Sequence, residues 1–282
     1  MKVNNLIIVL FLSVFAASCT ERIDINLDSQ KYARLVVEGT ISTDTAVHKI
    51  RLTKTADYFD NKPPEPVTEA SVIISSDEEE FQLTETPAGS GIYLTDPGVY
   101  GKVGKTYETR ITLKEQIGGY AEYSASSQIF EIYPIDSIAL EFKPDWGDAG
   151  FWEVKCYVLD RPTEDFYMFK LFRNNILVTD SINEIFVTDD LLYNGNYTNG
   201  IGVGYLNQAR DDQKLVPGDK VTLQISRITK EYTDFVMQVQ TEISYQSPLF
   251  SGPPANVQGN VNNGAFGFFA AAACTYSSAV AE

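Results

Sequence analysis

Hydrophobic and polar residues alternate along most of this chain, which is the pattern of β-strands that bury one face. The clearest run is 221–226, where Val221, Leu223 and Ile225 are separated by polar residues. Turn residues, chiefly glycine and proline, separate similar runs. We predict strands at 35–41, 48–53, 70–75, 80–84, 91–95, 105–113, 120–126, 135–142, 151–160, 166–174 and 265–276.

One segment has a different period. Between residues 230 and 245 apolar residues recur at intervals of three and four, so they fall on one face of a helix. Thr229 is a suitable N-cap, and Pro248 follows the predicted end. The sequence therefore predicts one amphipathic helix, whose apolar face carries Tyr232, Phe235, Val236, Val239 and Ile243.

Short strands with turn signals every ~8 to 12 residues are typical of a β-sandwich. The predicted fold is therefore mainly all-β. Pro134 is a plausible boundary between two parts. We predict an N-terminal Ig-like or transthyretin-like β-sandwich over residues 33–133. A second β domain, which carries the helix, is predicted over residues 134–282.

The N-terminus has the order of a secretory signal peptide. Lys2 supplies a positive charge, residues 6–15 are apolar except for one serine, and small residues at 16–18 precede Cys19. A cysteine at this place favours lipid attachment, and ordinary secretion is the alternative. We predict a lipoprotein signal peptide over residues 1–18, an acyl anchor at Cys19 and a polar tether over residues 19–32.

The chain is acidic, with a net charge of -16, which argues against nucleic acid as a partner. Beyond Cys19 it has only Cys156 and Cys274. Cys156 shares a predicted strand face with apolar residues and is expected to be a small buried side chain. Two separate thiols are favoured, and a disulfide between the two cysteines stays open.

Few residues offer catalytic chemistry. His48 is the single histidine, so a multi-histidine zinc site is excluded, and its position predicts a packed or rim side chain. The acids at 77–80 predict a solvated hairpin turn, and the glycines at 200–204 predict loop or strand backbone. Acidic pairs at 189–190 and 211–212 leave calcium binding open. We predict no catalytic residue, no metal site and no cofactor.

Aromatic residues give the better indication of binding. Tyr193, Tyr197 and Tyr205 lie in an Asn- and Gly-rich segment with Asn196, which reads as a long loop with at most one short strand. Rings with amide neighbours suit recognition of a glycan or a peptide. The alternative is that these tyrosines only fix a long loop to the sandwich.

A set of short motifs, taken in order, resembles the Bacteroidota lipoproteins that carry domain of unknown function 4249. The motifs are Leu35–Ile41, Gly91–Tyr93, Gly101–Tyr107, Pro217–Val221, Ile228–Tyr232, Gly252–Asn260 and Asn263–Phe269. The resemblance covers nearly the whole chain after Cys19. It implies an outer-membrane lipoprotein, often encoded beside a TonB-dependent transporter, and it implies no known catalytic residue.

These features together predict a non-enzymatic accessory to a TonB-dependent transporter that helps to capture or hand over a nutrient. The acids after Cys19 favour the cell surface over the periplasm. One alternative is a structural or adhesive lipoprotein that binds protein partners. Another is a hydrolase that uses two carboxylates, which would need a deep cleft with paired acids of different pKa.

Overall fold

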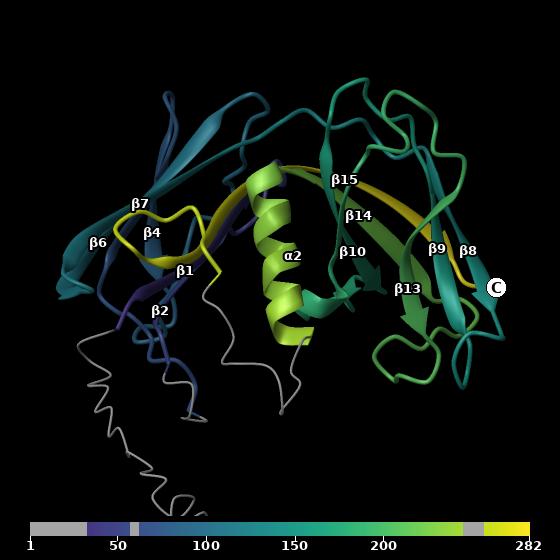
Figure 1. The fold of residues 1–282 in the computed structure, drawn as a ribbon, viewed down its shortest axis with the longest axis horizontal. Coiled ribbons are helices and arrows are strands. Elements are labelled where there is room, and N and C mark those ends of the chain that lie inside the picture. Colours follow the sequence, from purple (N-terminus) through teal and green to yellow (C-terminus); the bar gives the residue numbers. More distant parts are fainter. Residues whose placement is uncertain (1–32, 57–61, 245–256) are drawn as a thin grey trace, which may run out of the picture. The chain divides into compact units, whose positions relative to one another are not determined.

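β-Strands dominate the described part of the chain, which is residues 33–56, 62–244 and 257–282 of a computed structural model (Figure 1). The prediction of a mainly all-β fold with one amphipathic helix is confirmed. The predicted signal peptide, the lipidation site Cys19 and the tether lie outside the described residues. No helix within the three described ranges is long and apolar enough to cross a membrane.

Two sheets are formed. The larger has the strand order β11-β10-β14-β15-β1-β2-β5-β4-β3-β6-β7, with β12 also paired to β10, and the smaller has the order β13-β9-β8. The strands are β1 Leu35–Ser42, β2 Lys49–Lys54, β3 Ser71–Ser75, β4 Glu80–Glu85, β5 Ile92–Leu94, β6 Thr106–Ile117, β7 Tyr120–Gln128, β8 Ser137–Lys143, β9 Phe151–Tyr157, β10 Phe166–Arg173, β11 Ile176–Leu177, β12 Phe186–Asp189, β13 Ile201–Asn207, β14 Lys220–Ile228 and β15 Phe266–Val280.

The last strand joins the beginning of the fold to its end. β15 pairs with β1 in parallel through its first half and with β14 in antiparallel through its second half. Gly267 allows the close approach to β1: its φ is 87°, and a Cβ atom there would lie 2.0 Å from the carbonyl oxygen of Val37. Residues 33–282 accordingly form one compact unit.

The described residues form three hydrophobic cores, two large ones and a small one that includes Met168 and Val236. The first combines the strands before residue 130 with Phe269, Ala271 and Ala273 of β15. The second includes Val154, Leu171, Leu206 and Leu223. The boundary between residues 133 and 134 stays a prediction, although β15 contributes residues to the core of the N-terminal strands.

Helix α2, Lys230–Ser244, covers the other face of β15. The rings of Tyr232 and Phe235 lie 4.9 and 5.3 Å from that of Phe268, between centroids. Thr229 caps the helix, because its Oγ1 accepts a hydrogen bond from the backbone nitrogen of Tyr232 at 3.2 Å. β15 is thus buried on both faces, which explains why residues 267–273 are small or apolar without alternation.

Several local predictions are confirmed. Cys156 is buried and Cys274 is partly buried, and both are free thiols. His48 is buried, with Nε2 3.1 Å from the carbonyl oxygen of Val99. The acids at 77–80 form the turn and start of the β3–β4 hairpin, and glycines 202 and 204 lie in strand β13.

Candidate functional site

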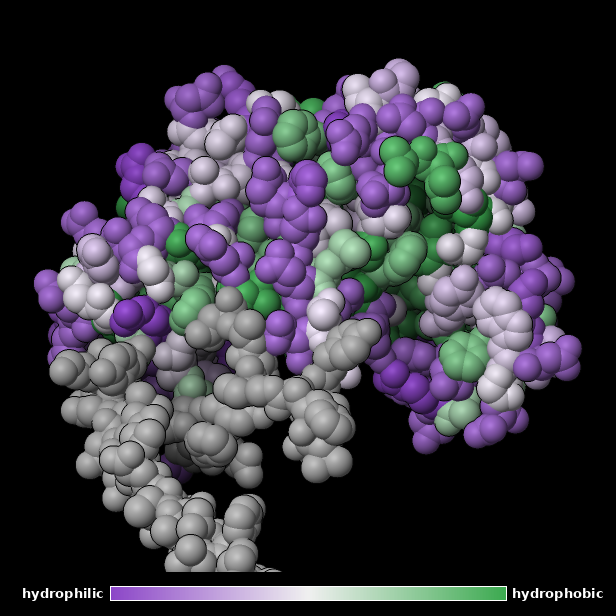
Figure 2. All heavy atoms as spheres, viewed as in Figure 1, coloured by the Kyte–Doolittle hydropathy of each residue, from purple (hydrophilic) through white to green (hydrophobic). Residues whose placement is uncertain are grey.

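A cavity opens between the two sheets in the second half of the chain. Its volume is ≈ 250 Å³, and strands β9, β10, β12 and β13 contribute its walls. Figure 2 shows the region as a hollow with hydrophobic residues to the right of helix α2. The apolar wall includes Ile132, Val158, Phe169, Ile201, Val203 and Ile225.

The rim of the cavity is also apolar and open to solvent. Leu192 is 85% exposed, and Leu159 and Phe186 are close to half exposed. Large exposed apolar side chains around a hollow are typical of a binding site rather than of a surface that only faces water.

Three acids, Asp160, Asp189 and Asp190, line the cavity, and Asp165 forms a buried cluster with Asp160 and Asp190. Asp160, Asp165 and Asp190 each offer a carboxylate oxygen that lies within 4.8 Å of the others, and these three residues are buried. Strand pairing brings them together. β12 pairs with β10 so that Asp189 lies opposite Phe166, and the backbone nitrogen of Asp190 donates to the carbonyl oxygen of Asp165 at 3.2 Å.

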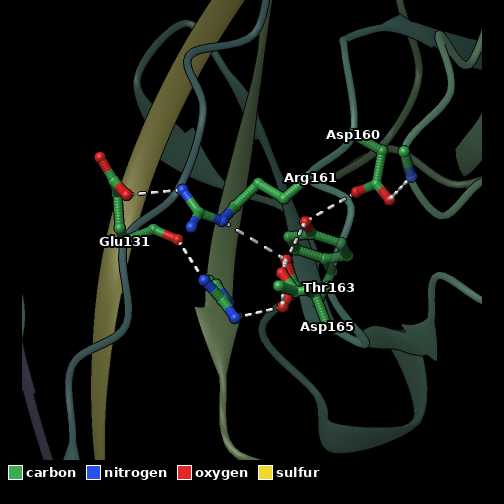
Figure 3. Close-up of polar contacts among 8 residues, drawn as sticks. Glu131, Asp160, Arg161, Thr163 and Asp165 are labelled. Carbon is green, nitrogen blue, oxygen red and sulfur yellow. Dashed lines mark hydrogen bonds and ion pairs between the residues drawn. The ribbon is translucent and has the colours of Figure 1, made fainter.

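Asp165 already has partners. Arg227 donates to its carboxylate, the hydroxyl of Thr163 lies 3.0 Å from its Oδ1, and the hydroxyl of Tyr167 lies 3.3 Å from its Oδ2. Figure 3 shows Thr163 beside Asp165, and Arg161 between Asp165 and Glu131. Arg161 donates to the Glu131 carboxylate at 2.6 Å. Asp165 is therefore part of a buried ion pair that fixes the loop between β9 and β10 to β14.

Asp160 is satisfied by neutral donors. The hydroxyl of Tyr167 donates to its Oδ1 at 2.8 Å, and the backbone nitrogen of Gly195 donates to its Oδ2 at 3.3 Å (Figure 3). Burial raises the pKa of Tyr167, so this hydroxyl keeps its proton and remains a donor.

Asp190 differs from both neighbours. It is only 4% exposed, and neither of its carboxylate oxygens has a hydrogen-bond partner among the described residues. Burial, and with it the negative charge of Asp160, raises the pKa of Asp190. The site therefore holds a buried carboxyl group that lacks a donor.

A family model for a domain of unknown function, DUF4249, matches residues 20–277. The chain belongs to the DUF4249 family. No curated protein matches the sequence. A solved structure from Bacteroides uniformis, described as a “putative carbohydrate binding protein”, is 10% identical and has a TM-score of 0.18. The alignment covers 69% of this chain and 88% of that one, and at this similarity it carries no argument.

The predicted binding residues of the DUF4249 chain fall into two groups. Tyr193, Asn196 and Tyr197 lie in one turn, in which the backbone nitrogen of Asn196 donates to the carbonyl oxygen of Tyr193 at 2.7 Å, whereas Tyr205 lies on a strand. Tyr193 lines the cavity beside Asp190. Tyr197 is 46% exposed and forms a β-bridge with Leu159, and the Asn196 side chain donates to the carbonyl oxygen of Asn194. Their role in binding a ligand stays a prediction.

Tyr205 lies in strand β13 rather than in a long loop, because the segment 201–207 pairs with β9. Its ring centroid lies 5.6 Å from that of Trp146. It lines a second, more polar hollow of ≈ 480 Å³, which shares Phe169, Phe186 and Val203 with the first.

Of the acidic pairs considered for calcium, only 189–190 contributes to the cluster, and it does so through Asp190 alone. Asp212 instead pairs with Arg210 on the surface. Carboxylates this close resemble the ligands that Ca²⁺ takes, but the Arg227 guanidinium beside Asp165 opposes a divalent ion. The sequence does not predict that Asp160 and Asp165 belong to a site, because nothing in the residues around an isolated acid next to a strand indicates that it is buried.

We predict that Asp190→Asn stabilises the unliganded DUF4249 chain at neutral pH by about 1–3 kcal/mol, because it removes a buried acid without a donor. A raised folded-state pKa means that wild-type stability falls as pH rises through that pKa. Asp190→Asn has no carboxyl group to ionise at this position, so its stability does not fall in this way. The gap in melting temperature between the two proteins should therefore be large at pH 7 and close at low pH, as measured by calorimetry.

An equal or lower melting temperature for Asp190→Asn at pH 7 would contradict this reading of the site. Asp189→Asn is the matched control, since the side chain of Asp189 is exposed and already accepts a hydrogen bond from the backbone nitrogen of Leu191 at 3.2 Å. It should leave the melting temperature nearly unchanged at every pH.

Proposed function

We propose that this chain is a lipid-anchored, non-enzymatic binding protein that takes up a small ligand in the cavity between β10 and β13. In this proposal it hands the ligand to a TonB-dependent transporter of the outer membrane, and Cys19 carries the anchor. The cavity is the single observation that supports capture most strongly, because it combines apolar walls, an open apolar rim and a group of acidic residues at one place.

The lipid anchor explains how a weak binder would serve a transporter. Tethering two partners to one membrane raises their effective concentration, so a modest affinity is sufficient for transfer. The acidic body of the protein, with its net charge of -16, would hold it away from anionic lipid headgroups rather than flat against them. Surface exposure remains part of the proposal.

The adhesive alternative needs a flat apolar patch without a pocket, and the exposed leucines here instead surround a cavity. The hydrolase alternative has one supporting observation, the pairing of Asp160 with Asp190. Glycoside hydrolysis, however, uses carboxyl groups roughly 5–5.5 or 6.5–9.5 Å apart. Here a carboxylate oxygen of each acid lies within 4.8 Å of the others, and both oxygens of Asp160 accept hydrogen bonds from the protein. This arrangement fits ligand binding better than hydrolysis.

Filling the cavity tests capture. Ile201→Trp places an indole in its wall, and Ile176→Trp places the same group at a position that is 69% exposed and outside the cavity. A small-molecule extract of the growth medium should raise the melting temperature of the wild type and of Ile176→Trp, but not that of Ile201→Trp. A shift that survives in Ile201→Trp would refute binding in this cavity.

A pull-down tests the transporter. The tagged chain, extracted from native outer membranes in mild detergent, should retain a stoichiometric TonB-dependent transporter that mass spectrometry identifies. If the chain is recovered alone, under conditions in which known transporter–lipoprotein pairs survive, the accessory role fails and a structural role gains support.

A further inference from the structure

The unpartnered carboxylate of Asp190 identifies the chemistry of the missing ligand. A buried acceptor without a donor costs free energy comparable to a lost hydrogen bond, and native structures rarely leave one unexplained. Both oxygens of Asp190 are in this state, and the residue lines a cavity that opens to solvent. A ligand that enters the cavity can supply the donor that the protein lacks.

The protein provides hydrogen-bond or ion-pair partners for Asp165 and Asp160 but none for the carboxylate of Asp190. Asp165 receives the charge of Arg227, and Asp160 receives the hydroxyl of Tyr167 and the backbone nitrogen of Gly195. Both nearby guanidinium groups pair with Asp165: Arg227 directly, and Arg161 at 3.9 Å while it also pairs with Glu131. Four carboxylates thus share two guanidinium groups, neither of which pairs with Asp190, so the site has an excess of negative charge. A cation at Asp190 would remove that excess.

The apolar walls of the cavity indicate the chemistry of the part of the ligand that does not contact Asp190. Val158, Phe169, Val203 and Ile225 form apolar walls, and the exposed rim is apolar as well. A bare or hydrated metal ion would leave these walls in contact with water. An apolar body attached to a cationic head matches both features, because burial of the body against the walls removes apolar surface from water.

We propose that the cavity binds a primary amine with an apolar body, whose ammonium group donates to Asp190 and lies beside Asp160. An ammonium carries three donors and one positive charge, so it can satisfy both oxygens of Asp190 at once. This inference rests on the proposed function, because it names the ligand class of the same cavity.

The test compares two probes with the same body. Isothermal titration calorimetry of the full chain in lipid nanodiscs is run with 2-phenylethylamine and with 2-phenylethanol. We expect the amine to bind about ten-fold more tightly than the alcohol, since a charge-assisted hydrogen bond is roughly twice as strong as a neutral one. In Asp190→Asn the amine should lose this advantage while the alcohol keeps its affinity. Ile201→Trp should bind neither probe.

Equal affinities of the wild type for the two probes would overturn the amine proposal and leave capture in the cavity standing. Binding of both probes by Ile201→Trp would place them elsewhere and overturn both proposals. Calcium that binds the wild type, fails to bind Asp190→Asn and displaces the amine would make the cluster a metal site and overturn the amine proposal alone.

Discussion

Replacing Arg227 by methionine is expected to destabilise the protein by about 3–5 kcal/mol, because it removes the direct partner of a buried carboxylate and leaves Asp165 with only one cationic partner, the Nε of Arg161, 3.9 Å away. The Asp165 side chain is fully buried, and that of Arg227 is 11% exposed. Arg227 also donates to the carbonyl oxygen of Glu131 at 2.6 Å and lies over the ring of Phe130. Urea unfolding, followed by circular dichroism, measures the loss as a lower transition midpoint.

Two controls separate the charge from the packing. Arg110→Met removes an exposed guanidinium that pairs with Glu108, and it should cost less than about 1 kcal/mol. Adding Asp165→Asn to Arg227→Met removes the buried carboxylate charge itself, so the double variant should recover part of the stability. A loss for Arg227→Met no greater than that for Arg110→Met would contradict a structural role for this pair.

Phe269→Ala is expected to cost about 3–5 kcal/mol, the range for truncation of a fully buried aromatic side chain. Phe269 is 0% exposed and belongs to the core formed by the N-terminal strands, although it lies near the C-terminus of the chain. The variant therefore tests whether β15 completes that core. The free energy of unfolding from urea titration is the measurement.

Val280→Ala is the control in the same strand, because Val280 is 58% exposed, and it should change stability by less than about 0.5 kcal/mol. If Phe269→Ala proved as mild as Val280→Ala, the N-terminal strands would not depend on β15. The pairing of β1 with the first half of β15 would then be wrong.

The sequence predicts local structure well here because strand and helix periods are local properties. The alternation at 221–226 and the three-and-four spacing at 230–245 depend only on neighbouring residues, and both elements form as predicted. The partner of a strand is a different matter. Nothing in residues 266–280 indicates pairing with β1, more than 200 positions earlier, because alternation carries no information on register with a distant strand.

The candidate site could not be predicted from the sequence either, because it too depends on pairing between strands. Asp160, Asp165 and Asp190 meet only because the four-residue strand β12 pairs with β10, and a segment that short gives no clear periodic signal. The segment 201–207 was expected to be largely loop because asparagine, glycine and tyrosine are frequent around it. Pairing with β9 overrides this composition and places Tyr205 on a strand.

Capture of a small ligand in the cavity is the central claim, and native mass spectrometry of the chain purified from its own membranes tests it most directly. The account predicts one additional small-molecule mass on the wild type and on Ile176→Trp, which is absent from Ile201→Trp. The same added mass on all three proteins, or no added mass on a wild type that has been exposed to growth medium, would contradict it.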